Sequence, residues 1–307
     1  MSPSGLNVRS NTRSHQKWDR WQRSTAWLFV SPFVAIFVVF TAFPAAVALF
    51  YSFTDLGIGS IRHPFEVHFV GLNTFRRVLS DALFRQALVT TILDVVIGVP
   101  VTMLIGLVLA VSLDSGISRL RAVYRSAFYL PVITNIVAAA VIWQYAFTLG
   151  GPINSLLAAL GLPGPNWLGD SNVAFGTVLT LAVWRNIGTC MVLFLAGLQS
   201  IQSDVYEAAS IDGASGWQKF LFITLPMLQP STLLVTVLMT VSFMNIFDEP
   251  FLVTKGGPLG TTRSIALWVY DQFGNGNIAP AMAGSYVMVA IVIVLSIVQL
   301  RFIRGSN

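Results

Sequence analysis

The sequence predicts an all-α integral membrane protein with six membrane-spanning helices. Of its 307 residues, 55% are hydrophobic and only 10% are charged. A soluble domain needs a polar exterior, and the apolar residues are spread too evenly along the chain to leave one. Several apolar runs also reach the roughly 20 residues with which a helix crosses the bilayer core. These observations exclude a soluble globular domain.

The spans are predicted from apolar runs bounded by polar or Gly- and Pro-rich segments. They lie at about 26–53, 86–113, 126–147, 172–198, 231–254 and 281–303. Together they form one domain, 26–303, between an N-terminal tail at 1–25 and a C-terminal end at 304–307. The first run is longer than the apolar core of a signal peptide, so we expect an uncleaved first span. Residues 148–171 are rich in Gly, Pro and Asn, which predicts an extramembrane loop with a short helix at 153–160.

The distribution of basic residues predicts the orientation. Eleven Lys and Arg residues lie on the side of the N-terminus and six lie on the other side. Loops that remain in the cytoplasm carry the excess of positive charge. We therefore predict that both termini and the connection at 199–230 lie in the cytoplasm.

The connection at 199–230 predicts a helix–turn–helix on the membrane surface. Asp204 is expected to cap the first helix, with Glu207 three residues later completing a capping box. Gly213 tolerates the left-handed conformation, so the first helix is expected to end at Asp212. The second is expected to begin near residue 215 and to run until Pro226 blocks it.

This connection carries a pattern with fixed spacing. It consists of Glu207, Ala208, Ala209, Asp212, Gly213, Ala214, Phe220, Ile223, Leu225, Pro226 and Pro230. The pattern resembles the E-A-A loop of permease subunits in bacterial carbohydrate ABC importers, the maltose-permease group. The F-V-G-L-N-T-F string at 69–75 and the string from 242 to 258 resemble the same permeases, although Val253 stands where leucine is usual. In that family the loop is a coupling helix that docks into a groove of the ATPase subunit, which is the role implied for Glu207 to Pro226.

The resemblance also implies partners and a location. The chain would be one of two homologous permease subunits, assembled with two ATPase subunits and an extracytoplasmic solute-binding protein in the lipid bilayer of a bacterial cell membrane. Its substrate would be a sugar. The implied cofactor, ATP with Mg²⁺, would be bound by the partner ATPase, and none would be bound by this chain.

Motifs for catalysis are absent from the sequence, which predicts a non-catalytic transport subunit. There is no G-x-x-x-x-G-K-[ST] for ATP, no H-E-x-x-H and no G-x-S-x-G, and Cys190 is the single cysteine. That cysteine lies in an apolar run and is read as a small buried hydrophobe. His63 and His68 have no third ligand at a matching spacing, so no metal site is expected. Basic residues flank apolar runs instead of forming one patch, so no nucleic acid is expected.

Charged residues inside the predicted spans indicate a function, because each costs about 2.5–3.5 kcal/mol at the centre of a membrane helix. Asp94 and Arg185 are expected either to form an ion pair between helices or to line a pathway. Asp248 and Glu249, directly before Pro250, predict that the fifth span is broken there. Irregular backbone at membrane depth persists only where it lines water or protein.

A sugar pathway is the role we favour for this group over helix packing alone. Carbohydrate sites combine aromatic rings with amide and carboxylate groups that hydrogen-bond to hydroxyls. The candidate pathway residues are Trp184, Arg185, Asn186, Asn245, Phe247, Asp248 and Glu249. The alternatives are an ABC permease for a glycerol-phosphate-type or other small polar solute, a six-span channel, a secondary carrier, or a membrane scaffold. An anionic solute should require more cations than Arg185 alone.

Overall fold

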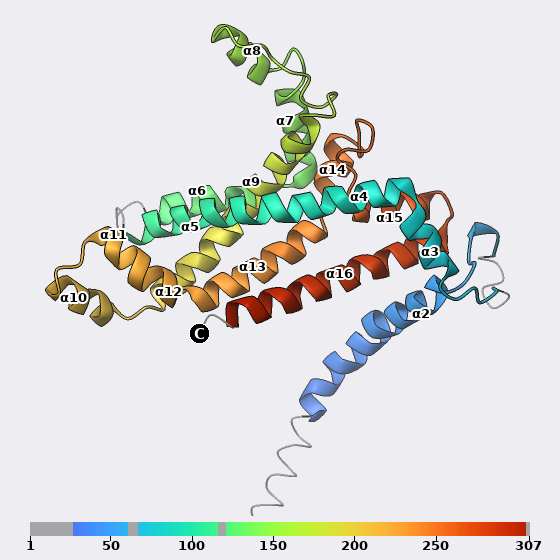
Figure 1. The fold of residues 1–307 in the computed structure, drawn as a ribbon, viewed down its shortest axis with the longest axis horizontal. Coiled ribbons are helices and arrows are strands. Elements are labelled where there is room, and N and C mark those ends of the chain that lie inside the picture. Colours follow the sequence, from blue (N-terminus) through green and yellow to red (C-terminus); the bar gives the residue numbers. More distant parts are fainter. Residues whose placement is uncertain (1–26, 61–66, 116–120, 305–307) are drawn as a thin grey trace, which may run out of the picture. The chain divides into compact units, whose positions relative to one another are not determined.

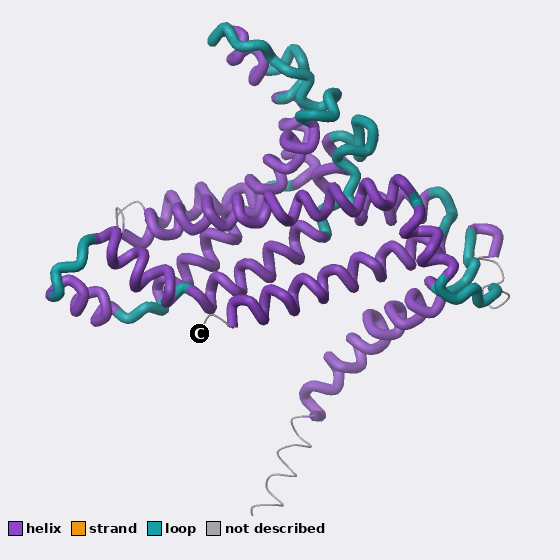
Figure 2. Tube along the Cα trace, viewed as in Figure 1, coloured by secondary structure: helices purple, strands orange, loops and turns teal. Residues whose placement is uncertain are grey.

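The computed structural model describes residues 27–60, 67–115 and 121–304. The predicted N-terminal tail and residues 305–307 therefore lie outside the described part of the chain, as does His63. Helices make up most of what is described, and the sole β pairing there is an isolated bridge between Thr54 and Phe69 (Figure 2). The prediction of an all-α fold is confirmed. The chain divides between Tyr51 and Ser52 into two compact units.

The first unit contributes one helical segment, which belongs to the span Trp27–Ser52. A π turn, η1 (Val38–Ala42), precedes α2 (Phe43–Ser52). Pro44 is the second residue of α2, directly after the widened turn. A π turn replaces the normal hydrogen-bond pattern, and this lets a proline enter a membrane helix without ending it.

The second unit begins with the connection to the next span, which contains η2 (Ile58–Ser60) and α3 (Asn73–Ser80). The backbone N–H of His68 donates to Oδ1 of Asp55 at 2.8 Å, and this hydrogen bond lowers the pKa of the Asp55 carboxyl. The His68 imidazole also lies 3.3 Å from the same carboxylate. The described histidine of the predicted pair is thus engaged with a loop carboxylate.

Four further segments are long and apolar enough to span a membrane (Figure 1). They are α4 (Ala82–Leu93) with η3 (Asp94–Gly98) and α5 (Val99–Ser115); α9 (Ala174–Gln199); α13 (Gln229–Met244) with α14 (Asp248–Val253); and α16 (Ile278–Arg304). A further helix, α15 (Ile265–Gly274), lies between α14 and α16 in the sequence. Among the described residues, the span count is five, or six if one bent pair is counted as a span.

The bent pair lies where a span is predicted at 126–147. Two helices, α6 (Arg121–Ile133) and α7 (Ile136–Ala146), meet at 92°. Asn135 causes the bend, because its backbone is extended and its side chain accepts hydrogen bonds from the N–H groups of Val137 and Ala138. An asparagine in this arrangement starts a new helix. The short helix expected in the following loop is present as α8 (Pro152–Ala159).

Helix α9 is central to the largest apolar core, and glycines set how closely its neighbours approach. A Cβ atom on Gly106 of α5 would lie 2.7 Å from Sγ of Cys190, which is fully buried. A Cβ on Gly188 of α9 would lie 2.7 Å from the backbone oxygen of Phe128 in α6. Small residues at such contacts let membrane helices pack backbone against backbone. Cys190 therefore serves as a small buried hydrophobe, as predicted.

We expect Gly188→Ala to destabilise the protein by about 1–3 kcal/mol, because the new methyl group meets backbone that cannot rotate away. Gly176→Ala is the matched control in the same helix, since a Cβ there meets nothing within 4 Å. The control gains helix propensity and should not lower stability. Thermal unfolding of both variants in one detergent measures the difference. Equal apparent Tm values would contradict the close packing of α6 on α9.

Candidate functional site

The connection at 199–230 forms the predicted helix–turn–helix, with a different start. Helix α10 runs over Ser203–Ile211, and its N-cap position is Gln202, which makes no side-chain cap. The predicted capping box of Asp204 and Glu207 is therefore wrong. The Asp204 carboxylate instead accepts a hydrogen bond from the neighbouring Ser203 hydroxyl at 3.3 Å.

A capping box is present at the second helix, α11 (Gly216–Lys219). The backbone N–H of Gln218 donates to Oγ of Ser215, and the Ser215 N–H donates to Oε1 of Gln218 at 2.8 Å. This reciprocal pair satisfies two backbone donors at the helix start. The predicted start near residue 215 is confirmed.

The turn between the two helices depends on Gly213. Its φ is +79°, and a Cβ there would meet nothing within 4 Å, so the need for glycine comes from the backbone alone. The N–H of Ala214 donates to the carbonyl of Ala209 at 2.9 Å, and the N–H of Gly213 donates to that of Ser210 at 3.2 Å. These are the two bonds of a Schellman motif. The prediction that the first helix ends at Asp212 is confirmed, because Asp212 is its C-cap.

Pro226 does not end the second helix as predicted. A π turn, η4 (Phe220–Thr224), follows α11, and Pro226 lies inside the short helix α12 (Leu225–Met227). The N–H of Leu225 donates to the carbonyl of Phe220, five residues back. This wider turn lets the backbone stay helical through the proline until Leu228, after which α13 begins.

Two side-chain hydrogen bonds join α10 to the segment that leads into α13. The Tyr206 hydroxyl lies 3.0 Å from Oγ1 of Thr224, and Nζ of Lys219 donates to Oγ of Ser210 at 2.6 Å. Tyr206 and Ser210 are four positions apart, so they share one face of α10. We call these two hydrogen bonds the brace. The sequence analysis missed the brace, although the four-residue spacing of Tyr206 and Ser210 could have indicated it.

The outer face of α10 remains exposed. Glu207, Ala208 and Asp212 are exposed, and the Ile211 side chain is exposed to 87%. Ala209, Ala214 and Phe220 are partly buried, so they hold the turn and the second helix in place. The structure thus separates the predicted docking residues into an exposed surface and its support.

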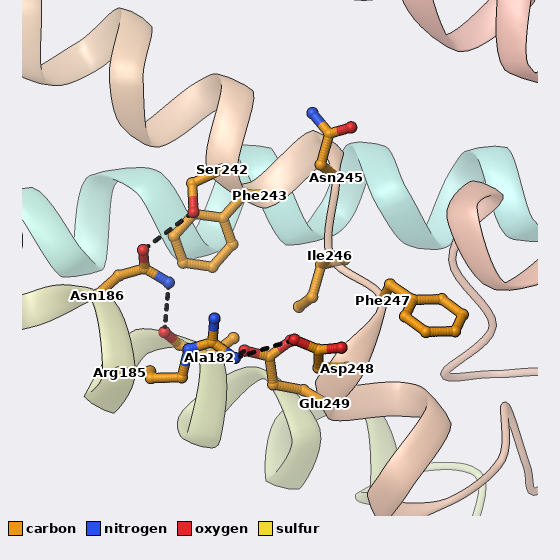
Figure 3. Close-up of a pocket in the computed structure, with 10 residues that line it drawn as sticks. All are labelled: Ala182, Arg185, Asn186, Ser242, Phe243, Asn245, Ile246, Phe247, Asp248 and Glu249. Carbon is orange, nitrogen blue, oxygen red and sulfur yellow. Dashed lines mark hydrogen bonds and ion pairs between the residues drawn. The ribbon is translucent and has the colours of Figure 1, made fainter. Parts of the chain in front are cut away.

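A second polar site lies where the fifth span is broken. The helix is interrupted over 245–247, between α13 and α14, directly before the acidic pair that predicted the break. A pocket of about 230 Å³ opens there (Figure 3). It is lined by Ala182, Arg185, Asn186, Ser242, Phe243, Asn245, Ile246, Phe247, Asp248 and Glu249.

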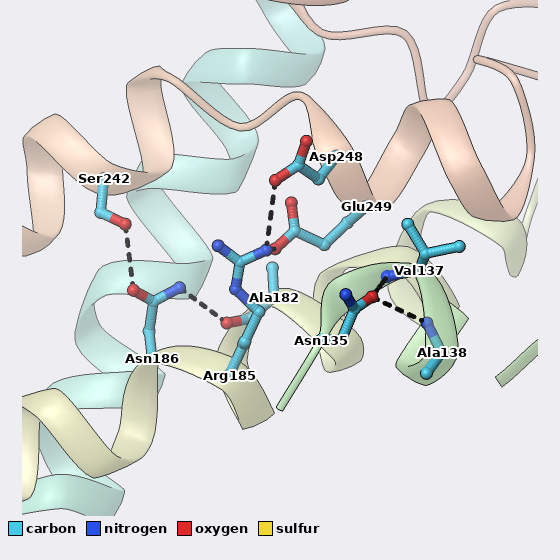
Figure 4. A network of polar contacts seen from close by, with 9 residues as sticks. All are labelled: Asn135, Val137, Ala138, Ala182, Arg185, Asn186, Ser242, Asp248 and Glu249. Atoms are coloured by element: carbon cyan, nitrogen blue, oxygen red, sulfur yellow. Dashed lines mark hydrogen bonds and ion pairs between the residues drawn. The ribbon is translucent and has the colours of Figure 1, made fainter. Parts of the chain in front are cut away.

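Arg185 of α9 forms ion pairs with both acids at the start of α14. Its Nη1 lies 3.1 Å from Oε1 of Glu249 and 3.5 Å from Oδ2 of Asp248 (Figure 4). The Glu249 side chain is only 6% exposed, whereas that of Asp248 is 46% exposed. Glu249 is therefore the buried counter-ion of Arg185, and Asp248 presents its carboxylate to the pocket.

The predicted ion pair between Asp94 and Arg185 is wrong. Asp94 is buried in η3, and Arg185 makes its ion pairs with the two acids of α14 instead. The break at 245–247 is the reason, because it directs the first turn of α14 toward α9.

The first turn of α14 carries two acids, and a neighbouring helix caps its other end. Acids in its first turn complement the positive end of the helix dipole. At its other end, Nε2 of Gln144 in α7 donates to the carbonyls of Leu252 at 2.8 Å and Val253 at 3.1 Å. Unpaired backbone groups at membrane depth cost several kcal/mol each, so these contacts hold the half-helix in place. The role of Gln144 was not predicted.

The amide of Asn186 links α9 to α13 beside the ion pairs. Its Nδ2 donates to the carbonyl of Ala182 at 2.9 Å, and its Oδ1 accepts from the Ser242 hydroxyl at 3.0 Å. Figure 4 shows both bonds on the Arg185 side of the pocket. Ser242 is a further lining residue that the sequence analysis missed.

Three predicted pathway residues lie apart from the ion pairs. Trp184 packs on Trp143 at a ring distance of 5.3 Å in an apolar cluster and does not line the pocket. The amide of Asn245 donates to the carbonyl of Val241, and Figure 3 shows it pointing away from Arg185. The Phe247 ring also points away, and it stacks on Phe251 at 5.1 Å.

The family model described as "Binding-protein-dependent transport system inner membrane component" matches residues 84–305. The chain belongs to this family. It is 33% identical to the lactose transport system permease protein LacF of Rhizobium radiobacter over 94% of this chain and 97% of that protein. It is 31% identical to the trehalose/maltose transport system permease protein MalF of Thermococcus litoralis over 90% and 92%.

A solved structure shares the fold. It is a bacterial alginate ABC transporter in complex with an alginate pentasaccharide-bound periplasmic protein, with a TM-score of 0.72 at 21% identity, over 92% of this chain and 95% of that one. The resemblance to ABC-importer permeases is confirmed. The chain is a multi-pass membrane protein of the binding-protein-dependent transport family, and its relatives are transport permeases.

We expect Arg185→Met to lower the free energy of unfolding by about 2–3 kcal/mol, because it leaves Glu249 buried and unpaired. Asp248→Asn removes a longer contact at a half-exposed carboxylate and should cost under about 1 kcal/mol. Arg185→Met combined with Glu249→Leu should recover much of the loss, since no charge is stranded. Thermal unfolding of the three variants in detergent tests the order. A larger loss in Asp248→Asn than in Arg185→Met would contradict it.

We expect Tyr206→Phe to loosen α10, because it removes the hydrogen bond to Thr224 and keeps the ring. A bond worth about 1 kcal/mol corresponds to roughly fivefold faster amide exchange across α10. Hydrogen exchange followed by mass spectrometry measures this rate. Glu207→Gln is the control, since it alters an exposed residue of the same helix and should leave exchange unchanged. Equal exchange in Tyr206→Phe and the native chain would show that the bond does not brace the helix.

Proposed function

We propose that this chain is a membrane-spanning permease subunit of an ATP-driven, binding-protein-dependent sugar importer. One observation carries the proposal. A single continuous segment from 203 to 253 holds both the exposed face of α10 and the broken helix that lines the polar pocket. A partner that moves α10 therefore acts directly on the helix at the pocket.

The subunit works with partners that bind the nucleotide and deliver the solute. It pairs with a second homologous permease, two ATPase subunits that hold ATP with Mg²⁺, and an extracytoplasmic solute-binding protein. The family description and the periplasmic protein bound in the alginate transporter support this assembly. Both termini and α10 face the cytoplasm of a bacterial cell in the proposed orientation, as the distribution of basic residues favours.

The coupling mechanism uses the exposed face around Glu207 and Ile211. Closure of the ATPase pair pushes on α10, and the bonds from Tyr206 and Ser210 carry that displacement to the base of α13. Displacement of α13 relative to α9 then changes the side from which the pocket is open. Rigid-body rocking around a fixed site is a common way to alternate access.

A sugar is the substrate class that the pocket chemistry supports. The half-exposed carboxylate of Asp248 accepts hydrogen bonds from hydroxyl groups, and Asn186 and Ser242 add polar atoms at the same wall. Relatives named for lactose and for trehalose and maltose transport point the same way. Arg185 is the sole cation among the described lining residues and already has two carboxylate partners, so an anionic glycerol phosphate is a weaker candidate.

We expect Glu207→Lys with Gly213→Asp to abolish coupling, because it reverses the charge at position 207 on the exposed face and strains a residue at φ +79°. Sugar uptake by cells that carry the complete transporter should fall at least about tenfold, and the ATPase should no longer co-purify with the tagged chain. Gln202→Lys with Gly216→Asp is the control, since it adds charges of the same kind off that face and at an unstrained glycine. Uptake and ATPase recovery equal to those of the control would contradict the role of α10.

The substrate class is tested on the same preparation. The complex is purified with its solute-binding protein, and ATP turnover is measured with a panel of neutral sugars and glycerol phosphodiesters. Stimulation by a sugar supports the proposal. Stimulation by a phosphodiester alone supports the alternative permease, and solute exchange by the chain without ATP in liposomes supports a carrier or channel.

A further inference from the structure

Helix α3 lies where two spans begin. Asp81 alone separates it from α4, the first helix of the span Ala82–Asp114. Val78 of α3 is buried in one apolar cluster with Phe84 of α4 and Trp268 of α15. Helix α3 also packs against α16. These contacts place α3 beside α4 and α16, the first helix of one apolar span and the whole of another.

The faces of α3 have different chemistry. Thr74 and Val78 are buried, and the Thr74 hydroxyl donates to the carbonyl of Thr54 at 3.0 Å. Leu72 and Leu79, seven positions apart, form an apolar flank with exposures of 71% and 49%. An interfacial helix has this combination of one apolar flank and one basic face.

The basic face consists of Arg76 and Arg77. With Asn73, Ser80 and Asp81 they line a shallow depression of about 590 Å³. Both arginines are exposed, and neither has an acidic partner among the described residues. The Asp81 carboxylate is engaged with the start of α4, where it accepts the N–H of Leu83 at 2.8 Å. Among the described residues, the depression therefore holds two guanidinium groups without an acidic partner and a net positive charge.

We propose that Arg76 and Arg77 bind the phosphate of an anionic phospholipid headgroup. Guanidinium groups present paired N–H donors that match phosphate oxygens, and arginine keeps its charge at the membrane surface. The exposed leucines of the apolar flank, Leu72 and Leu79, belong to the same short segment, and the acyl chains of a bound lipid would cover them. A soluble anion would contact the arginines and leave these leucines in water, so the combination favours a lipid.

The lipid site explains two basic residues that the predicted membrane orientation does not explain. Arg76 and Arg77 are on the side with fewer Lys and Arg residues, where a positive charge opposes the usual topology bias. A bound lipid phosphate neutralises that charge. The proposal does not depend on the solute or on the ATPase.

Native mass spectrometry of the purified full chain tests the site. The chain is incubated in mild detergent with phosphatidylglycerol or with phosphatidylcholine, and the lipids retained per chain are counted. We expect the native chain to retain phosphatidylglycerol preferentially. Arg76→Gln with Arg77→Gln should reduce that retention at least about threefold. Arg76→Lys with Arg77→Lys keeps the charge and should retain an intermediate amount of phosphatidylglycerol. The lysine pair also tests the site if the glutamine pair does not fold.

Arg125→Gln with Arg301→Gln is the matched control, since it removes two exposed arginines elsewhere on the chain. An equal loss of lipid in this control would show that net charge alone retains the lipid and would overturn the site. Unchanged retention in the glutamine and lysine pairs at 76 and 77 would overturn it as well. Weaker activation by the solute-binding protein with unchanged lipid retention would assign the patch to that protein instead.

Discussion

The buried ion pair between Arg185 and Glu249 is the contact on which the polar centre of this protein depends. A charged side chain within a membrane span is costly unless it meets a partner, and each of these two residues is the other's close partner at 3.1 Å. The pair can form because the fifth span breaks at 245–247 and turns the first turn of α14 toward α9. The break in turn is tolerated because Gln144 donates hydrogen bonds to the last carbonyls of α14 and the two acids complement the positive end of its dipole.

The segment from 203 to 253 connects the surface helix α10 to the pocket at the broken span. From α10 the chain runs through α11, η4 and α12 into α13 without leaving the helical region for more than a short turn. Two hydrogen bonds fold α10 back onto this segment, so the exposed face around Glu207 is joined to α13 by side chains as well as by backbone. Glycine at 213 is the one position where the chain must take a left-handed conformation between the two helices of the loop.

Local sequence signals predicted the elements that depend on one residue type. Gly213 predicted the end of α10, and the acids beside Pro250 predicted the broken span, because backbone freedom and the cost of buried charge are properties of those residues themselves. The partner of Arg185 could not be predicted in this way. Asp94 and Glu249 are both acids inside apolar runs, and only the direction of α14 after the break decides which of them meets the guanidinium. The bend at Asn135 was missed for a related reason, since an asparagine inside an apolar run is as compatible with a polar helix contact as with a cap. The packing of Trp184 on Trp143 could not be predicted either, because an aromatic ring packs equally well on another ring and on a sugar.

Irregular backbone occurs at three places in the 203–253 segment, between the exposed helix α10 and the pocket. The π turn η4 lies between Lys219 and Thr224, the two residues to which α10 is hydrogen-bonded; the turn at Leu228 lies at the base of α13, and the break at 245–247 lies at the pocket. Regular helix between these points transmits displacement, because bending it would lengthen backbone hydrogen bonds that have no substitute in the membrane. At the interruptions the regular helical hydrogen bonds are already replaced. The N–H of Leu225 bonds the carbonyl five residues back, and side chains bond the backbone of α14. The helix axis can therefore change direction there at a smaller cost in free energy. In the proposed importer, a push on α10 therefore moves α13 as a rod and changes the geometry mainly at its two ends, one of which is the pocket.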